Sequence, residues 1–591
     1  MDQETTNSSP YLFWLPYAAF LLITYIYFGF ISNYILYFQE KSSLFIFSYE
    51  FLQEHLNKPG GLLIWLGKFL SAFFYYPPVG ALILSSVLTL IVFSITKINY
   101  ILTGKYKLII SFLIGVILFY LQTNYRFLIF NNLGLLLQLG LFCLVIRFNA
   151  FFKGWLSVII VPFIYYTTGG FIWIYLLLMS FYLISAFKKT ILLRFFSMWA
   201  LSMILYLSAR EFIFFQSDKT LITYPILQYN EGSQLIVFLI VAGIISILPA
   251  ILRIRFREHR NFSISNVQQS IIGTTILLFI LVIIAIARFD NKKKKYFYVE
   301  KLFFENRFNE VIEFNTVNPP TNLLTIYLNN IALCETGRLD DQLFHFPQNK
   351  EGKTLFLEWK MESEILKHGG YFYYTAGMIN EAHRWAFENM VMKGFTSDGL
   401  RMLIKTELIN ANYDMAEKYI NILRHSLFYR KEAVKFEKLM TNCLNGGSNN
   451  EIIQKRQEKT QHDYFTISEN PYINIEMTLA SDSMNRKAFE YKMAFLLLHK
   501  DYNGILHELR GYERLGYTEL PAHIEEAVIA LAISNKGKMP DTGNIRVSKK
   551  TELRWNQYLT VLQQYGNNIK SAEPVLKKQF GNTFWYYVFY K

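Results

Sequence analysis

The sequence predicts an all-α protein in two parts: a polytopic transmembrane helix bundle, followed by a soluble, tetratricopeptide-like α-helical repeat domain. Charge is the first observation that predicts this, because residues 1–290 hold only 29 charged residues and residues 291–591 hold 75. The first part is too apolar for a soluble fold, and the second has an ordinary soluble composition. A second observation is a helical turn that recurs along residues 291–591.

The first part contains about nine apolar segments long enough to span a bilayer. They lie near residues 11–36, 79–97, 108–122, 127–147, 154–168, 171–187, 191–208, 235–252 and 269–288. Loops rich in Lys and Arg alternate with poorer ones, and the richer loops face the cytoplasm in multi-pass proteins. This predicts an inner-membrane protein with a cytoplasmic N-terminus and a periplasmic C-terminal domain. The run Lys292–Lys295 favours a cytoplasmic C-terminal domain instead. Counting the apolar segment 61–77 as a further span would also reverse the predicted side of this domain.

Two predicted outer loops are long, at residues 37–78 and 209–234. The first contains Glu50 and Glu54, which share one face if the segment is helical because they are four residues apart. Close like charges raise the pKa of one carboxyl group, and a raised pKa suits a general base. We therefore predict Glu50 and Glu54 as candidate catalytic residues.

Two arginines belong to the same predicted side of the membrane. Arg126 lies in the short turn between the third and fourth spans, and Arg210 opens the second long loop. The arginine fork binds phosphate through two hydrogen bonds, so both are candidate substrate-binding residues. In the alternative interpretation, these arginines and the two glutamates are ordinary interfacial charges that reach toward the lipid headgroups.

The second part repeats a pattern of helix, tight turn and helix. Each turn has polar residues or Gly, then an apolar residue, then an acidic or amide residue that opens the next helix; the turns lie at 305–314, 335–344, 376–387, 410–420 and 499–506. Their spacing is near the ~34 residues of a tetratricopeptide repeat. A polar loop near 441–486 interrupts the array, and the aromatic C-terminus is predicted to cap it. Further helices are predicted at 487–500, 503–515, 521–535 and 551–565.

Motifs of known chemistry are missing from the sequence. It has no phosphate-binding loop, dinucleotide fingerprint, nucleophile elbow or HExxH pair, so we predict no cofactor and no metal. Free thiols are favoured over a disulfide between Cys334 and Cys443. His368-Gly369-Gly370 is interpreted as a helix end. The net charge of +14 lies mainly in loops between apolar segments and predicts no nucleic-acid partner.

Several segments resemble an uncharacterised family of Bacteroidota membrane proteins with a tetratricopeptide-like C-terminal part. The resemblance covers nearly the whole chain and is carried by PGGLLIWLGKFLSAFFYYPPVGALI at 59–83, INEAHRWAFE at 379–388, RKAFEYKMAFLLL at 486–498, LPAHIEEAV at 520–528 and GNTFWYYVFY at 581–590. It implies an inner-membrane location and supplies no activity.

The order of parts is also similar to that of membrane glycosyltransferases that use polyprenyl-phosphate sugars. Those enzymes have a first span, a long outer loop with a catalytic acid, tight hairpins, a second long outer loop and often an outer domain. The resemblance implies that Glu50 or Glu54 activates the acceptor and that Arg126 and Arg210 hold the lipid phosphate. This chain departs from the plan in having glutamates where those enzymes usually have an aspartate, and fewer spans.

Three functions follow as hypotheses. The leading one is transfer of a sugar from a polyprenyl-phosphate carrier at the outer face of the inner membrane, with the repeat domain presenting the acceptor or a protein partner. The alternative is a non-enzymatic scaffold, in which the bundle anchors a repeat domain that recruits envelope proteins or peptides. The third is a transporter, which the scarcity of intramembrane acids and the lack of repeated broken helices disfavour.

Overall fold

The computed structural model describes residues 10–148, 150–184, 189–229, 232–256, 265–349, 352–360, 363–446, 451–459, 470–534, 538–566 and 568–591. Helices account for most of these residues and no β-strand occurs among them, so the predicted all-α class is confirmed. The chain forms two compact units. One consists of Met1–Lys294 with His425–Phe428, and the other of Lys295–Arg424 with Tyr429–Lys591.

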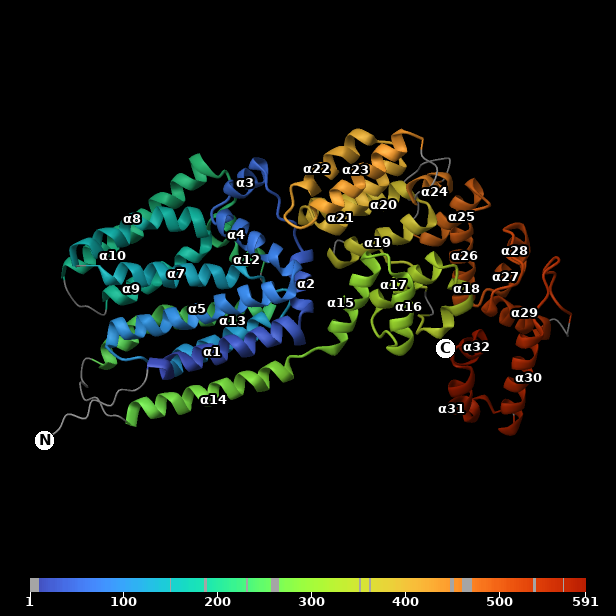
Figure 1. Ribbon diagram of the computed structural model, residues 1–591, viewed down its shortest axis with the longest axis horizontal. Coiled ribbons are helices and arrows are strands. Elements are labelled where there is room, and N and C mark those ends of the chain that lie inside the picture. The colour runs from blue at the N-terminus through green and yellow to red at the C-terminus, as the bar shows by residue number, and fades with distance from the viewer. Residues whose placement is uncertain are drawn as a thin grey trace. The chain divides into compact units, whose positions relative to one another are not determined.

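Long helices run lengthwise through the first unit (Figure 1). They are α1 (Pro10–Ile26), α5 (Pro77–Thr103), α6 (Leu108–Gln122), α7 (Phe130–Arg147), α8 (Ala150–Thr168), α9 (Ile172–Ile184), α10 (Lys189–Ser208), α13 (Gly232–Phe256) and α14 (Ser265–Ala287). Among the described residues, five stretches are long and apolar enough to cross a membrane, namely Phe13–Ile31, Pro77–Thr103, Phe130–Arg147, Leu156–Ile184 and Gly232–Leu252. These stretches indicate a membrane protein, and the count of nine spans stays a prediction.

The stretch Leu156–Ile184 is not one straight helix. A short 3₁₀ turn at Gly169–Phe171 separates α8 from α9. The Tyr175 hydroxyl in α9 donates a hydrogen bond to the Ser157 carbonyl in α8 at 3.5 Å. Because these residues would lie about 27 Å apart along a straight helix, α8 and α9 must fold back on each other.

The two long loops contain short helices. The first loop holds α2 (Tyr34–Lys41), α3 (Tyr49–Leu56) and α4 (Gly61–Ala72), and the second holds α11 (Asp218–Thr223) and α12 (Ile226–Tyr229). Gln39 in α2 ties the first loop to the turn between α6 and α7. Its side-chain amide donates to the Phe127 carbonyl at 3.0 Å and accepts from the Ile129 backbone N–H at 3.2 Å.

The last long helix of the first unit ends beside the same turn. Arg288 follows α14, and its guanidinium donates a hydrogen bond to the Thr123 hydroxyl at 3.1 Å. Lys293 Nζ lies 5.4 Å from the centre of the Tyr125 ring. The basic run that starts at Lys292 therefore follows α14 at the end of the bundle that carries the first long loop, which we call the loop end.

The second unit is built from shorter helices that pack on their neighbours in sequence, as α19 to α23 do. Before the polar stretch lie α15 (Asn291–Phe304), α16 (Phe308–Val317), α17 (Leu323–Glu335), α18 (Leu339–Gln342), α19 (Ser363–Ala376), α20 (Ile379–Lys393), α21 (Ser397–Ile409), α22 (Tyr413–Arg424) and α23 (Arg430–Leu444). After it lie α24 (Glu451–Glu458), α25 (Pro471–Ser481), α26 (Arg486–His499), α27 (Tyr502–Glu508), α28 (Arg510–Arg514), α29 (Ala522–Ser534), α30 (Lys549–Gln564), α31 (Ile569–Phe580) and α32 (Phe584–Tyr590). The helices predicted at 487–500, 521–535 and 551–565 are confirmed, whereas the one predicted at 503–515 is divided into α27 and α28.

The turns that look alike in sequence share one backbone geometry. Each contains a single residue with positive φ: Asn306 (57°), Gly337 (65°), Gly377 (87°), Ala411 (60°) and Lys500 (54°). The next residue donates its N–H to a carbonyl five positions earlier, as Arg338 does to Leu333 at 2.8 Å. This is the Schellman ending of a helix, which stops one helix and redirects the chain into the next. The tetratricopeptide type itself stays a prediction.

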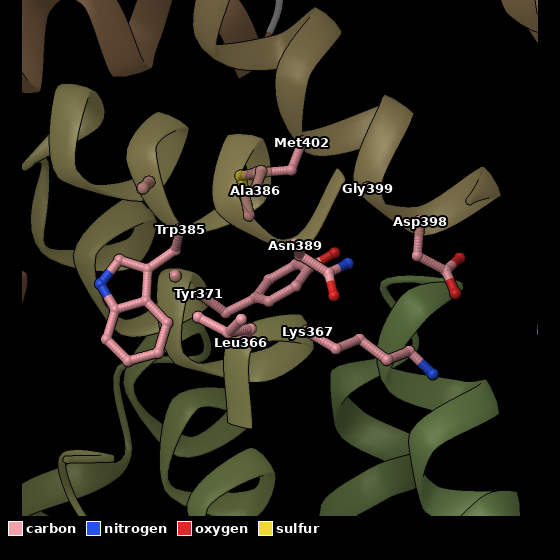
Figure 2. A pocket seen from close by; sticks show the side chains of 11 residues that line it. Leu366, Lys367, Tyr371, Trp385, Ala386, Asn389, Asp398, Gly399 and Met402 are labelled. Carbon is pink, nitrogen blue, oxygen red and sulfur yellow. The ribbon is translucent and has the colours of Figure 1, made fainter. Parts of the chain in front are cut away.

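His368-Gly369-Gly370 is not a helix end, contrary to the sequence interpretation. All three residues lie inside α19, where Gly369 and Gly370 pack against Trp385 of α20, whose ring lies at one side of the pocket in Figure 2. A Cβ on Gly369 would lie 2.1 Å from the Trp385 ring. The two glycines are therefore explained by a close helix crossing rather than by chain reversal.

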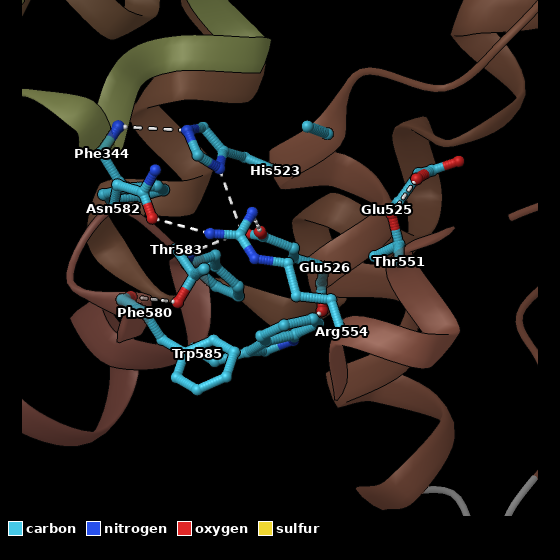
Figure 3. A network of polar contacts seen from close by, with 12 residues as sticks. Phe344, His523, Glu525, Glu526, Thr551, Arg554, Phe580, Asn582, Thr583 and Trp585 are labelled. Atoms are coloured by element: carbon cyan, nitrogen blue, oxygen red, sulfur yellow. Dashed lines mark hydrogen bonds and ion pairs between the residues drawn. The ribbon is translucent and has the colours of Figure 1, made fainter. Parts of the chain in front are cut away.

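The segments 520–528 and 581–590 meet in a buried polar network (Figure 3). The Glu526 carboxylate accepts from the Phe584 backbone N–H at 2.7 Å and lies 3.0 Å from His523 Nδ1. The Trp585 indole donates to the Glu526 carbonyl at 2.7 Å. The aromatic C-terminus thus packs onto α29 through a carboxylate that is 1% exposed.

Glu526→Ala is expected to destabilise the second unit. The change leaves the Phe584 N–H and His523 buried without their acceptor, which costs about 3 kcal/mol of unfolding free energy. Glu552→Ala, on the exposed side of α30, is the control and should change stability by less than about 0.5 kcal/mol. Thermal unfolding of the full-length protein in detergent measures both, and equal midpoints for the two variants would contradict the assignment.

Candidate functional site

The four predicted site residues lie on exposed parts of the first unit. Glu50 and Glu54 project from α3, Arg126 lies in the turn before α7, and Arg210 lies in the π-helical turn that follows α10. All four residues are described, and no hydrogen bond or ion pair joins any two of their side chains. Their convergence on one cavity stays a prediction.

Two of these residues have local partners that weaken their predicted roles. The pKa of Glu50 is lowered, because its carboxylate accepts a hydrogen bond from its own backbone amide at the start of α3. This lowered pKa is the opposite of the raised pKa that is expected of a general base. The Arg210 guanidinium lies 3.4 Å from the Glu211 carboxylate and 3.6 Å from that of Asp218, so its charge is already balanced.

Backbone contacts join the two long loops to the turn between α8 and α9. The Gly60 N–H donates to the Tyr166 carbonyl at 3.0 Å, and the Gly170 N–H donates to the Tyr224 carbonyl at 2.6 Å. The Trp173 indole donates a further hydrogen bond to the second loop, to the Ile222 carbonyl at 2.9 Å. We call this arrangement the glycine junction. It consists of residues 58–61, 166–170 and 221–225.

The junction needs glycine because the three backbones touch. Gly60 and Gly169 have φ values of 81° and 57°, a region that residues with a Cβ rarely adopt. A Cβ on Gly169 would also lie 2.4 Å from the Tyr224 carbonyl oxygen and 2.5 Å from that of Pro59. A Cβ on Gly60 would lie 2.8 Å from the Gly169 nitrogen. The close approach therefore follows directly from the glycines.

Charged and aromatic side chains gather around the junction. Lys58 Nζ lies 5.7 Å from the centre of the Tyr224 ring, and the Tyr224 and Tyr229 rings are 6.3 Å apart. Burial raises the pKa of both tyrosine hydroxyls, and the nearby Glu54 carboxylate adds to the shift. Of the two predicted catalytic residues, Glu54 is the one whose charge acts on these tyrosines, and its catalytic role stays a prediction.

Glu54 also acts electrostatically on His55, the next residue of α3, and on Lys68 of α4. His55 is buried, with Nδ1 2.7 Å from the Phe51 carbonyl, and burial lowers its pKa to about 4. The imidazole is therefore neutral, with Nδ1–H donating to that carbonyl and Nε2 left as an acceptor. Lys68 Nζ lies 5.4 Å from the Phe51 ring centre.

This arrangement suits an amphiphile with an anionic head. Lys58 supplies a cation, and Lys68 supplies an amine whose pKa is lowered by burial; Tyr224 and Tyr229 supply amphipathic rings, and Glu54 supplies a carboxylate. Ammonium groups bind phosphate oxygens, and tyrosine suits the boundary between lipid and water.

A family model matches residues 8–591, which is nearly the whole chain. The chain belongs to DUF6057, a family of unknown function. No curated protein and no solved structure matches it. The function of this DUF6057 protein therefore has to be argued from its own residues.

The sequence reasoning found the loops but missed the junction between them. Nothing in the local sequence marks Pro59-Gly60-Gly61 and Gly169-Gly170 as neighbours. The available signal was the occurrence of glycine or proline pairs in turns that flank apolar helices. Lys58 and Lys68 were also missed, because nothing in their local sequence marks them as facing Tyr224 or Phe51.

Gly169→Ala is expected to open the junction. The positive φ and the overlap with Tyr224 and Pro59 should lower the unfolding free energy by more than about 2 kcal/mol. Gly140→Ala is the matched control, because a Cβ there meets nothing within 4 Å inside α7, and Ala is favoured over Gly in a helix by about 1 kcal/mol. Thermal unfolding in detergent measures both. A Gly169→Ala variant as stable as Gly140→Ala would show that the three segments do not touch.

Proposed function

We propose that this DUF6057 protein is an integral membrane glycosyltransferase that transfers a sugar from a polyprenyl-phosphate carrier at the outer face of the inner membrane. The observation that supports the proposal is the glycine junction, which brings both long loops and their charged residues to the ends of apolar helices. A polyprenyl-phosphate sugar needs this combination, since its tail lies in the bilayer and its phosphate and sugar lie at the surface.

Lys58 and Lys68 would hold the carrier phosphate in the proposed site. They replace Arg210, whose charge is balanced by Glu211 and Asp218; Lys58 lies beside the Tyr224 ring, and Lys68 lies beside the Phe51 ring of the first loop. As phosphate leaves, negative charge grows on its oxygens, and an adjacent ammonium group stabilises that charge. Arg126 keeps the role of an exposed cation beside Tyr125.

Glu54 would be the general base. It would accept the proton of the acceptor hydroxyl as the acceptor oxygen bonds to the anomeric carbon. The bond from that carbon to the phosphate oxygen breaks in the same step, and the polyprenyl phosphate leaves with the electron pair. We favour Glu54 over Glu50 because Glu54 acts electrostatically on Tyr224 and Tyr229, whereas Glu50 is held by its own helix start.

A second candidate function is a membrane-anchored scaffold. It is supported by the repeated Schellman turns of the second unit, because helices stacked through identical turns present an extended surface for a peptide or protein. In this function the membrane bundle only anchors the second unit, and the residues at the junction carry no chemistry.

Glu54→Gln is expected to lower glycan transfer at least about 100-fold, because general base catalysis contributes factors of this size. Glu50→Gln, on the same helix face, is the matched control and should keep near-normal transfer. The measurement is surface glycan or glycoprotein in cells whose own copy is replaced by each variant, with protein abundance checked by blot.

Unchanged glycan in abundant Glu54→Gln protein would rule out the catalytic assignment. A pull-down with residues 296–591 alone then tests the scaffold. Partners that bind this fragment as strongly as the full chain support the scaffold, and loss of all partners contradicts it.

The proposed orientation is expected to expose the loop end outside the inner membrane. In a background with the native cysteines changed to serine, Gln53→Cys and Lys219→Cys should react with an impermeant maleimide added to intact spheroplasts. Arg147→Cys, at the opposite end of α7, should react only after the cells are lysed. The reverse pattern would place the loop end, and with it the proposed chemistry, in the cytoplasm.

A further inference from the structure

A buried cluster of ionisable side chains joins α15 to α19 in the second unit. Glu300 Oε1 lies 2.8 Å from His368 Nε2 and 2.9 Å from Lys367 Nζ. Glu364 lies one turn before His368 on α19 and faces the same cluster. One ligand atom from each of Glu300, Glu364 and His368 lies within 4.8 Å of the other two.

The histidine is oriented by its backbone. His368 Nδ1 lies 2.6 Å from the Glu364 backbone carbonyl, which can only accept a hydrogen bond, so Nδ1 carries the proton. In the neutral ring, Nε2 then carries a lone pair, and this lone pair faces the Glu300 carboxylate. Two lone-pair atoms 2.8 Å apart repel each other unless a proton or a metal cation lies between them. A histidine whose Nδ1–H is held by a carbonyl is the usual state of a metal ligand.

The carboxylate oxygens indicate whether a proton or a metal ion fits the cluster better. Glu300 Oε2 and Glu364 Oε2 are both buried, and neither has a hydrogen-bond partner. A second proton on His368 would satisfy Glu300 Oε1 and leave both of these oxygens without a partner. A metal ion among the three side chains would engage His368 Nε2 and a carboxylate oxygen from each glutamate. Buried carboxylate oxygens without partners are costly, so the ion accounts for more of the observations.

We propose that Glu300, Glu364 and His368 bind one divalent transition-metal ion, of which Zn²⁺ is the reference case. One imidazole nitrogen with two carboxylates suits Zn²⁺, Mn²⁺ or Fe²⁺ better than the all-oxygen sites of Ca²⁺ and Mg²⁺. For ligands about 2.1 Å from the ion, neighbouring ligand atoms lie about 3.0–3.4 Å apart. Glu300 Oε1 and His368 Nε2, 2.8 Å apart, are slightly closer than this, and all three ligand atoms lie within 4.8 Å of one another.

Lys367 is the feature that a metal has to accommodate. Its ammonium group donates a hydrogen bond to Glu300 Oε1, so it can stay on that oxygen while Oε2 turns to the ion. Figure 2 shows Lys367 extended away from Trp385 on the same side of the pocket as Asp398. The two glutamates supply two negative charges to the ion and Lys367 together.

The site would fasten α15 to α19. α15 is the first helix of the second unit and carries Glu300 as a fully buried charge. An ion held by both helices stabilises the start of this unit, because free energy of metal binding adds to the free energy of folding. This site shares no residue with the glycine junction, so a result against the proposed function would not count against the metal site.

Zn²⁺ binding to the chelator-stripped, full-length protein in detergent tests the proposal. Equilibrium dialysis should give one tightly bound equivalent per chain, and Zn²⁺ should raise the thermal midpoint. Glu364→Gln and His368→Gln should each weaken this binding at least about 100-fold. His383→Gln is the matched control, since His383 Nε2 also lies near a glutamate, 3.7 Å from Glu407, outside the cluster. Binding of Co²⁺ with a visible absorption band adds a readout that does not depend on stability.

Each result decides the proposal. Loss of the tight equivalent and of the Co²⁺ band in Glu364→Gln, with both kept in His383→Gln, supports the site. Glu364→Gln keeps its buried surroundings and a similar shape, so it tests binding even if His368→Gln does not fold. Equal binding by wild type and Glu364→Gln would overturn the site. A wild type that binds no Zn²⁺ but loses stability as the pH rises would show that a proton holds the cluster.

Discussion

The contact of three backbones at the glycine junction is the constraint on which the loop end of the bundle depends. Gly60 and Gly169 allow the first long loop, the α8–α9 turn and the second long loop to approach within hydrogen-bonding distance. Backbone groups in such a place must bond to each other, because water is scarce beside apolar helices. The junction thus turns two long connections into one structural element, and the positions of Lys58 and Tyr224 follow from it.

The charges near the junction make chemical sense once this geometry is known. Glu54 acts electrostatically on Lys68, on a neutral His55, on the buried Tyr224 and on the partly exposed Tyr229, whereas Glu50 is held by its own helix start. The same distinction separates the cations, because Arg210 is already paired and Lys58 faces an aromatic ring. Electrostatic surroundings, rather than residue type, therefore decide which of the predicted side chains carry the proposed chemistry.

The sequence predicts what depends on local patterns. Apolar length marks the long helices, and the recurring turns correspond to Schellman endings at positions such as Gly337 and Lys500. Tertiary contacts are not readable in this way. His368-Gly369-Gly370 has the composition of a helix end, yet it lies inside α19 because Trp385 packs onto it from another helix. Glu300 and His368 are likewise far apart in the chain, and no local spacing marks them as neighbours.

Photo-cross-linking with a polyprenyl phosphate that carries a diazirine beside the phosphate tests the central claim most directly. The full-length protein in a lipid nanodisc should be labelled in peptides that contain residues 54–68 or 221–229. Excess unlabelled polyprenyl phosphate should abolish that label. Label confined to other peptides, or label that the competitor does not reduce, would contradict the account and show that the glycine junction holds loops together without binding the lipid carrier.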